Sequence, residues 1–238
     1  MRQDLYKDLY IQEGKHWWHI SKRNVVKGML GAILHNRSLK ILDIGCGAGK
    51  TMDMLSRFGT VWGLDNNKKA LSFCKKRGFQ HLMLADAADT GFKDNFFDVV
   101  TMLDVLEHTD ENTTLQEIKR ILKPDGFMII TVPTYQWLWS SWDEALKHKK
   151  RYTKYNLGAV VKKNGFTIIK SSYMYSFLTL PVFIFRKLKS RQKSYESDFS
   201  TNPPFVNFLC TLFANIERYF VMRGWIPFGT SLILVCKK

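Results

Sequence analysis

Short apolar runs alternate with helix-length segments through the middle of the chain. The run over 40–44 ends in a loop of closely spaced glycines, the segment over 50–58 reads as a helix, and a second apolar run over 61–64 ends in Asp65. Apolar runs of this length, bounded by turn residues, are typical of buried strands. We therefore predict six strands with intervening helices over residues 39–175 and a last strand over residues 230–238.

A long segment separates the last two predicted strands, 166–171 and 231–236. A structureless loop of about sixty residues is unusual in a compact domain, and apolar residues within 205–220 recur at the three-four spacing of an amphipathic helix. The apolar face of this helix has three open roles: cover for the core, a dimer seam, or a slot for a lipid. We predict one domain, divided into an N-terminal helical segment (1–38), a core (39–175), a helical insertion (176–229) and a last strand (230–238).

The glycine loop over 45–49 is the clearest sign of a ligand site. Glycines tolerate the positive φ of a tight turn and present N–H groups without side-chain obstruction. Because a helix follows, the loop is expected at a helix N-terminus. A P-loop requires an earlier glycine where this chain has Ile44, and a dinucleotide fingerprint requires G-x-G-x-x-G, whereas this loop reads G-x-G-x-G. Asp65 follows sixteen residues after Gly49, at a spacing that suits a carboxylate holding a ribose diol.

Further motifs follow the loop in order. They are an apolar run with an acidic turn (82–87), a strand-like run with a turn (97–108), and a helix end, Pro/Gly turn and apolar run (121–133). With the glycine loop, this series resembles the class I S-adenosylmethionine-dependent methyltransferases, most closely the branch that includes quinone-biosynthesis methyltransferases. The resemblance implies an α/β, Rossmann-like, seven-stranded, mostly parallel sheet with helices on both faces and an N-terminal helical lid. It also implies S-adenosylmethionine as cofactor and S-adenosylhomocysteine as product.

The resemblance assigns cofactor contacts to residues along these motifs. The implied contacts are Asp43 for the loop and amino group, Gly45, Gly47 and Gly49 for methionine and ribose, Asp65 for the ribose hydroxyls, Asp86 and the Ala87 amide for adenine, and Leu103 and Asp104 for the ammonium. A carboxylate suits a diol because its two oxygens accept both hydroxyl hydrogens. In the lid, Arg23 is the predicted partner of the methionine carboxylate, with Trp18 nearby. Alternatively, Trp17 and Trp18 pack in the hydrophobic core.

Methyl transfer to a hydroxyl requires alignment with the sulfonium and loss of the hydroxyl proton. Histidine is a suitable base near neutral pH, and His148 follows the fifth predicted strand, where open sheets bind ligands. We predict His148 as the base and a substrate role for Arg151 in the same loop. The alternatives for the base are His108, His16 and His19.

No metal site is predicted. Glu107 and His108 form a pair that caps a helix or binds a metal, and no other histidine or cysteine lies at ligand spacing beside them in the sequence. The cysteines also lack metal or disulfide spacing, which favours a reducing cytoplasm. They are Cys46, Cys74, Cys210 and Cys236.

The chain carries a formal net charge of +15, with two dense basic runs over 147–154 and 186–193. Solvated surface explains most such runs. The functional alternatives are anionic lipid headgroups, a phosphorylated substrate or RNA. An apolar run over 177–185 directly precedes the second basic run, which favours a membrane surface. No apolar run reaches 18 residues and no signal-peptide stretch begins the chain, so we expect a cytoplasmic, membrane-peripheral protein.

These features predict a methyltransferase that O-methylates a small or lipid-linked molecule. One rival is an RNA methyltransferase, which the charge favours and the lack of a recognisable RNA-binding appendage disfavours. The other is a catalytically silent binding protein with the same fold, which Asp65 and the loop glycines disfavour. The run 202–205, Asn-Pro-Pro-Phe, matches a motif of nucleic-acid amino-methyltransferases, but those enzymes carry it after the fourth strand, and here it reads as a helix entry. The oligomeric state stays open.

Overall fold

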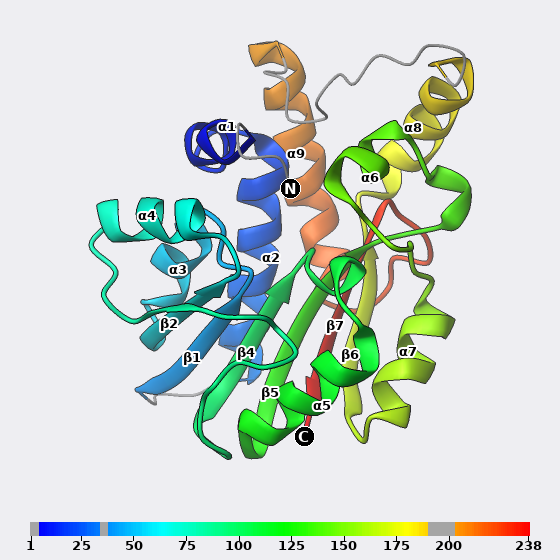
Figure 1. The fold of residues 1–238 in the computed structure, drawn as a ribbon. Helices are drawn as coiled ribbons and strands as arrows, with labels where there is room; N and C mark the ends of the chain where they lie inside the picture. Colours follow the sequence, from blue (N-terminus) through cyan, green and yellow to red (C-terminus); the bar gives the residue numbers. More distant parts are fainter. Residues whose placement is uncertain (1–4, 34–37, 190–202) are drawn as a thin grey trace.

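A computed structural model of the chain describes residues 5–33, 38–189 and 203–238. Its centre is a seven-stranded sheet in the order β3-β2-β1-β4-β5-β7-β6 (Figure 1). Strand β7 runs antiparallel to both of its neighbours, and the other pairs are parallel. The predicted fold class is therefore confirmed. The strands are β1 (Leu39–Ile44), β2 (Gly59–Asp65), β3 (Leu82–Leu84), β4 (Phe97–Leu103), β5 (Leu122–Pro133), β6 (Thr167–Met174) and β7 (Ser231–Lys237).

Helices cover both faces of the sheet, and the alternation of strand side chains explains why. Along β5, Met128, Ile130 and Val132 pack on one face, while Ile129 packs on the other. The first face is covered by α5 (Glu111–Ile121) and α7 (Lys154–Lys163). The opposite face is covered by α2 (Trp17–Ile33), α3 (Lys50–Leu55), α4 (Lys68–Lys76) and α9 (Pro204–Val221).

The remaining described elements lie near the carboxyl ends of the parallel strands. Helix α1 lies beside α4, and α6 and α8 lie beyond β5 and β6 (Figure 1). These ends are where open α/β sheets bind ligands. The elements are α1 (Leu5–Gln12), the 3-10 turns η1 (Leu106–His108) and η2 (Gln136–Leu138), α6 (Ser141–Leu146) and α8 (Ser176–Lys189).

The N-terminal segment and the insertion pack against each other although they are far apart in sequence. Helix α9 lies along α2, and the Trp17 backbone N–H donates to Asn207 Oδ1 at 2.9 Å. At the other end of α9, Glu217 accepts hydrogen bonds from the backbone N–H groups of Tyr175 and Ser176 at 2.5 and 2.7 Å. These bonds fix both helices at one side of the strand ends.

The apolar stripe of α9 does not cover the core. Small or polar residues, Ala214, Glu217 and Val221, are the buried positions of this helix. Most of the predicted stripe is exposed, with Phe205 at 70% and Phe208 at 62%. Leu180 of α8 is exposed as well, at 66%. In the described parts of the chain, the helices fall short of the length and hydropathy that a bilayer span requires.

Some sequence features lie outside the described residues. They are Asn202 of the Asn-Pro-Pro-Phe run and two cations of the second basic run, Arg191 and Lys193. Pro204 and Phe205 begin α9, which agrees with the helix-entry interpretation. A helix start of this kind uses proline where its missing N–H would have no intrahelical partner.

Candidate active site

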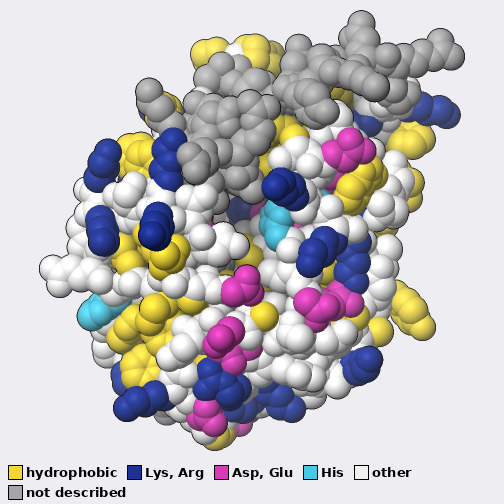
Figure 2. Space-filling model, viewed as in Figure 1, with side chains coloured by type: hydrophobic (Ala, Val, Ile, Leu, Met, Phe, Trp, Pro, Cys, Tyr) yellow, Lys and Arg dark blue, Asp and Glu magenta, His cyan; other side chains and the backbone are white. Residues whose placement is uncertain are grey.

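A cavity of about 840 Å³ lies at the carboxyl ends of the parallel strands. In the space-filling view the surface is hollowed near the middle of this face, with cationic side chains on both sides (Figure 2). Residues from the glycine loop, from β2 and from the turn after β3 line one part of the cavity. The other part is lined by α2, the turn after β4, the loop over 133–151, α8 and α9.

The glycine loop turns its backbone toward this cavity. Gly45, Gly47 and Gly49 have φ values of 69°, 55° and 89°, in the left-handed region that favours glycine. A Cβ on Gly45 would lie 2.3 Å from Val105 Cγ2, so a side chain there would displace the neighbouring turn. Gly45 and Gly47 line the cavity, and Gly49 caps the start of α3.

Two buried carboxylates lie beside the loop, and one of them, Asp65, bonds it. Asp65, at the end of β2, accepts hydrogen bonds from the backbone N–H groups of Gly47 at 3.0 Å and Asn67 at 2.9 Å. Each oxygen keeps a second lone pair for a ligand. Asp43, at the end of β1, accepts from Thr101 Oγ1 at 2.6 Å. Burial raises the pKa of Asp65, and it raises the pKa of Asp43 to about 7.

The remaining predicted cofactor residues also line the cavity. Asp86 and Ala87 form the turn after β3, where Asp86 Oδ1 accepts from the Ala88 N–H at 2.9 Å. Leu103 ends β4. From the lid, Trp18 and Arg23 line the cavity. The fold thus brings together residues from the lid and from four strand ends.

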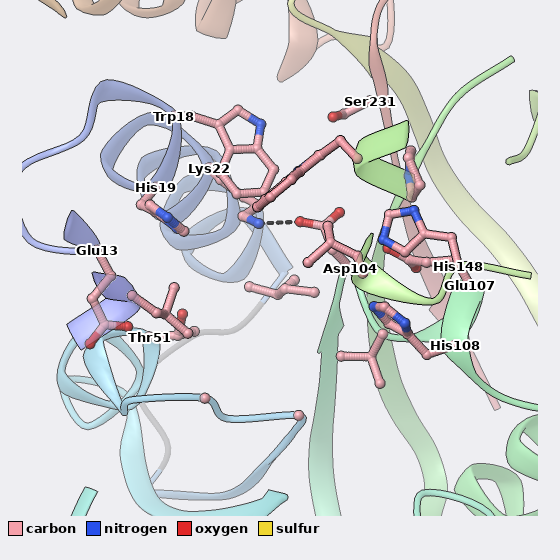
Figure 3. A pocket seen from close by; sticks show the side chains of 18 of the residues that line it. Glu13, Trp18, His19, Lys22, Thr51, Asp104, Glu107, His108, His148 and Ser231 are labelled. Carbon is pink, nitrogen blue, oxygen red and sulfur yellow. Dashed lines mark hydrogen bonds and ion pairs between the residues drawn. The ribbon is translucent and has the colours of Figure 1, made fainter. Parts of the chain in front are cut away.

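An ion pair connects the lid to the sheet. Lys22 of α2 pairs with Asp104, which follows β4 with a left-handed φ of 57° (Figure 3). Thr131 Oγ1 also donates to Asp104, at 3.1 Å. The Lys22 ammonium lies 3.6 Å from the centre of the Trp18 ring, a cation–π distance. Three charged or aromatic groups therefore hold the lid over the end of β4.

The predicted base belongs to a buried hydrogen-bond network. His148 Nδ1 lies 2.8 Å from Asp143 Oδ1. Arg151 donates from Nε and Nη2 to the two oxygens of Asp143 at 2.8 and 2.9 Å, and from Nη1 to the Thr134 carbonyl at 3.2 Å. Burial alone would raise the pKa of Asp143, but the hydrogen bonds from His148 and Arg151 hold it below its usual value. The network orients His148. It also uses the Arg151 guanidinium for hydrogen bonds to Asp143 and Thr134.

Two further titratable groups lie beside His148. The His108 and His148 rings meet edge to face, with centroids 4.7 Å apart. Burial lowers the pKa of His108 to about 4, so this ring is neutral near pH 7. Glu107 is fully buried, and neither oxygen of its carboxylate has a hydrogen-bond partner in the structure as described. Burial, followed by the charge of Asp104, raises the pKa of Glu107 well above its usual value.

Sequence reasoning missed several of these residues. Lys22 and Glu13 line the cavity from the lid without a motif that marks them. Asp143 had a local signal, because Ser140 and Asp143 stand three apart at the start of α6 and form a capping box. Spacing along the chain could not place His148 beside Glu107 and His108, since forty residues separate His108 from His148.

Comparison with known proteins identifies the central part of the chain. Residues 42–130 match the family model of a methyltransferase domain. The chain is 32% identical over 104 residues to a ubiquinone biosynthesis O-methyltransferase of Actinobacillus pleuropneumoniae, covering 39% of this chain and 44% of that protein. It is 33% identical over 96 residues to a tRNA (carboxymethyluridine(34)-5-O)-methyltransferase of Arabidopsis thaliana, covering 39% of this chain and 23% of that protein. Such matches span less than half the length of these relatives.

The fold comparison covers more of the chain. A crystal structure of a SAM-dependent methyltransferase from Archaeoglobus fulgidus superposes with a TM-score of 0.59 and 19% identity, covering 91% of this chain and 94% of that one. The predicted family resemblance is confirmed over the matched domain, and the predicted Rossmann-like fold is confirmed beyond it.

Proposed function

We propose that this chain, whose residues 42–130 match the family model of a methyltransferase domain, is an S-adenosylmethionine-dependent methyltransferase that O-methylates a small or lipid-linked molecule. One observation carries the proposal. A single cavity joins the glycine loop and Asp65 to a second compartment containing a histidine oriented by a buried carboxylate. The first part suits the cofactor, and the second suits a hydroxyl acceptor.

The residues of the first compartment fit S-adenosylmethionine. Backbone N–H groups of a loop without side chains suit the methionine and ribose portions. The second lone pairs of Asp65 would accept the ribose hydroxyls, and Asp86 and the Ala87 amide would face adenine. The left-handed turn at Asp104 lies in the cavity wall, where its backbone would meet the ammonium, and Arg23 would pair with the methionine carboxylate. The bound cofactor would supply an electrophilic methyl group.

The residues of the second compartment would act on the acceptor. His148 would take the hydroxyl proton on Nε2, because its Nδ1 is engaged with Asp143. Asp143 and Arg151 would orient the ring and stabilise its protonated form, as positioning residues. His108 is the alternative base, and its low pKa makes it the weaker proton acceptor near pH 7.

The apolar wall of the cavity supports a lipid-linked acceptor. Leu178, Val182 and Phe185 of α8 and Val206 of α9 line the second compartment. The same two helices carry exposed apolar residues away from the cavity, among them Leu180 and Phe208. Lys187 is an exposed cation on α8. We propose that these helices contact an anionic membrane and that the acceptor enters the cavity between them.

The acceptor class can be tested with a labelled methyl group. The protein would be incubated with methyl-labelled S-adenosylmethionine in three separate samples. Each sample would contain one fraction of a cell extract: lipids, small molecules or RNA. The proposal predicts label in the lipid or small-molecule fraction and much less label with the Asp65→Ala variant at the same concentration of S-adenosylmethionine. Label confined to RNA would contradict it.

An RNA acceptor is the second candidate. The tRNA methyltransferase relative and the net charge of +15 favour it. The apolar lining from α8 and α9 disfavours it, because RNA recognition relies on cationic and stacking surfaces. A silent binding protein would bind S-adenosylhomocysteine without labelling any fraction.

A further inference from the structure

Glu107, His108 and His148 meet on the cavity wall opposite Glu13 and Thr51 (Figure 3). One carboxylate oxygen and one nitrogen from each imidazole all lie within 4.8 Å of one another. We propose that these three side chains bind a divalent first-row transition-metal ion such as Zn²⁺, which takes the acceptor hydroxyl as a further ligand. The ion's role in methyl transfer rests on the proposed function, but its binding does not.

Each imidazole forms a hydrogen bond through one ring nitrogen, as metal-binding histidines usually do. His148 Nδ1 bonds Asp143 Oδ1 at 2.8 Å, and the His108 ring donates to the backbone carbonyl of Lys147. A neutral imidazole that donates through one nitrogen keeps a lone pair on the other. Arg151 fixes Asp143 through two hydrogen bonds, so the orientation of His148 is set before an ion binds.

The carboxylate of Glu107 is an independent observation. It is completely buried, and neither oxygen has a hydrogen-bond partner in the part of the chain that the structure describes. Leaving a buried carboxyl group without a partner is costly. The two cations whose charges act most on Glu107 are engaged elsewhere, Lys22 with Asp104 and Arg151 with Asp143. A metal ion between Glu107 and the imidazoles would give the Glu107 carboxylate a partner.

The donor set indicates the class of ion. Two imidazoles and one carboxylate favour Zn²⁺, Co²⁺ or Fe²⁺, whereas Mg²⁺ prefers oxygen ligands. Bonds of about 2.0–2.1 Å place the ligand atoms of a tetrahedral site about 3.3 Å apart, so modest side-chain shifts would close the present cluster. Three protein ligands leave an open position, as in catalytic sites. All three line the cavity, so an acceptor can reach that position.

The chemistry of the open position follows from the charge of the ion. A hydroxyl oxygen of the acceptor bound there would have a lower pKa and would release its proton to water. Its oxygen then forms the bond to the methyl carbon, while the sulfur–carbon bond of the sulfonium breaks and leaves its electron pair on sulfur. With the ion bound, His148 Nε2 is a ligand, so water accepts the proton that His148 would take in the metal-free protein.

Metal binding can be measured without any acceptor. The full chain, purified without a histidine tag and treated with a chelator, would be titrated with Zn²⁺ by calorimetry and with Co²⁺ by visible absorption. We expect one ion per chain, at least a hundredfold weaker binding in Glu107→Gln and His108→Asn, and ten- to a hundredfold weaker binding in Asp143→Asn. His81→Asn is the matched control, because His81 is an exposed histidine outside the cavity lining.

The affinity for S-adenosylhomocysteine, measured on the same samples, separates variants that fail to fold from variants that have lost only a metal-binding side chain. The proposal is supported if Glu107→Gln binds S-adenosylhomocysteine normally but has lost Zn²⁺. No ion on the wild type, or equal Zn²⁺ affinity in Glu107→Gln and His108→Asn, would overturn it and leave His148 as a direct base. A wild type that binds Zn²⁺ at this cluster but not S-adenosylhomocysteine would instead contradict the proposed function.

Discussion

Replacing Asp65 with Ala should weaken the binding of S-adenosylmethionine and S-adenosylhomocysteine alike. Asp65 is buried at the end of β2, and its two oxygens already accept the N–H groups of Gly47 and Asn67. Their second lone pairs would accept the two ribose hydroxyls. The substitution therefore removes the ligand contact and, at the same time, the side chain that holds the glycine loop.

The size of the affinity loss follows from the negative charge of the Asp65 carboxylate. Two ribose contacts would be lost, and each hydrogen bond to the ionised Asp65 contributes about 1.5–3 kcal/mol, but water that enters the space left by Asp65→Ala would compensate for about one of them. We expect a total loss of about 1.5–3 kcal/mol, which is roughly a ten- to more than a hundredfold rise in Kd. Calorimetry with each ligand measures it directly.

The control is Asp98→Ala. Asp98 also accepts a backbone N–H, from Lys40 at 2.9 Å, and bonds Lys123 at 2.7 Å, but it does not line the cavity. This variant should lose comparable protein contacts and keep the ligand affinity. An unchanged Kd in Asp65→Ala would refute the ribose assignment, and equal losses in both variants would show that the effect is structural.

Three further outcomes are expected. His148→Gln should lower turnover with little change in cofactor affinity, and the pH–rate profile should lose its limb near neutral pH; wild-type turnover across pH would remove His148 from the mechanism. Changing Lys187, Lys189, Arg191 and Lys193 of the second basic run to Gln should reduce flotation with anionic liposomes, since each cation near such a surface contributes about 1 kcal/mol, and equal recovery of both proteins would contradict membrane binding. Arg186 of the same run is kept, because it donates to the Leu138 carbonyl and lies 3.9 Å from Asp143. Relative to a Glu13→Gln variant, the ligand-free protein should lose stability as the pH rises from about 4 through 7, because burial raises the pKa of Glu13 to about 7 in the folded chain, and comparison with the variant removes the opposing contribution of His108, whose pKa folding lowers to about 4. A difference in melting temperature between the two proteins that does not fall from pH 5.5 to pH 8 would contradict the raised pKa of Glu13.

The parts of the fold that sequence predicted are those with local signals. The strands over 39–44 and 59–65, the glycine loop between them and the acid that closes the second strand all lie within one strand–loop–helix unit. The positive φ values at Gly45 and Gly47 favour glycine, and a carboxylate follows directly after an apolar strand. Both features can be recognised in a single sequence. The sequence therefore predicted which residues line this part of the cavity, and their contacts with a cofactor stay predictions.

The second compartment of the cavity depends on contacts that no local sequence pattern records. His148 meets His108 only because β4 and β5 are neighbours in the sheet, which brings the segments after these two strands together. Lys22 meets Asp104 across 82 residues because the lid folds back over the end of β4. Spacing along the chain consequently predicted neither the contact between His108 and His148 nor the ion pair between Lys22 and Asp104.

Helix α9 shows a different limit. Its three-four periodicity correctly indicated an amphipathic helix, but periodicity does not identify the buried face. Packing against α2 selects the positions of Ala214 and Val221, whose small side chains allow close approach, and leaves the larger apolar side chains outside. Tertiary packing decided the orientation.

The central claim is that the cavity is a cofactor site for methyl transfer. Calorimetric titration of the wild-type chain with S-adenosylhomocysteine, repeated in the presence of saturating S-adenosylmethionine, tests it most directly. The account predicts one site per chain and complete loss of the binding heat when S-adenosylmethionine occupies the cavity. No binding heat, unchanged heat under competition, or tighter binding of a nicotinamide dinucleotide would contradict it.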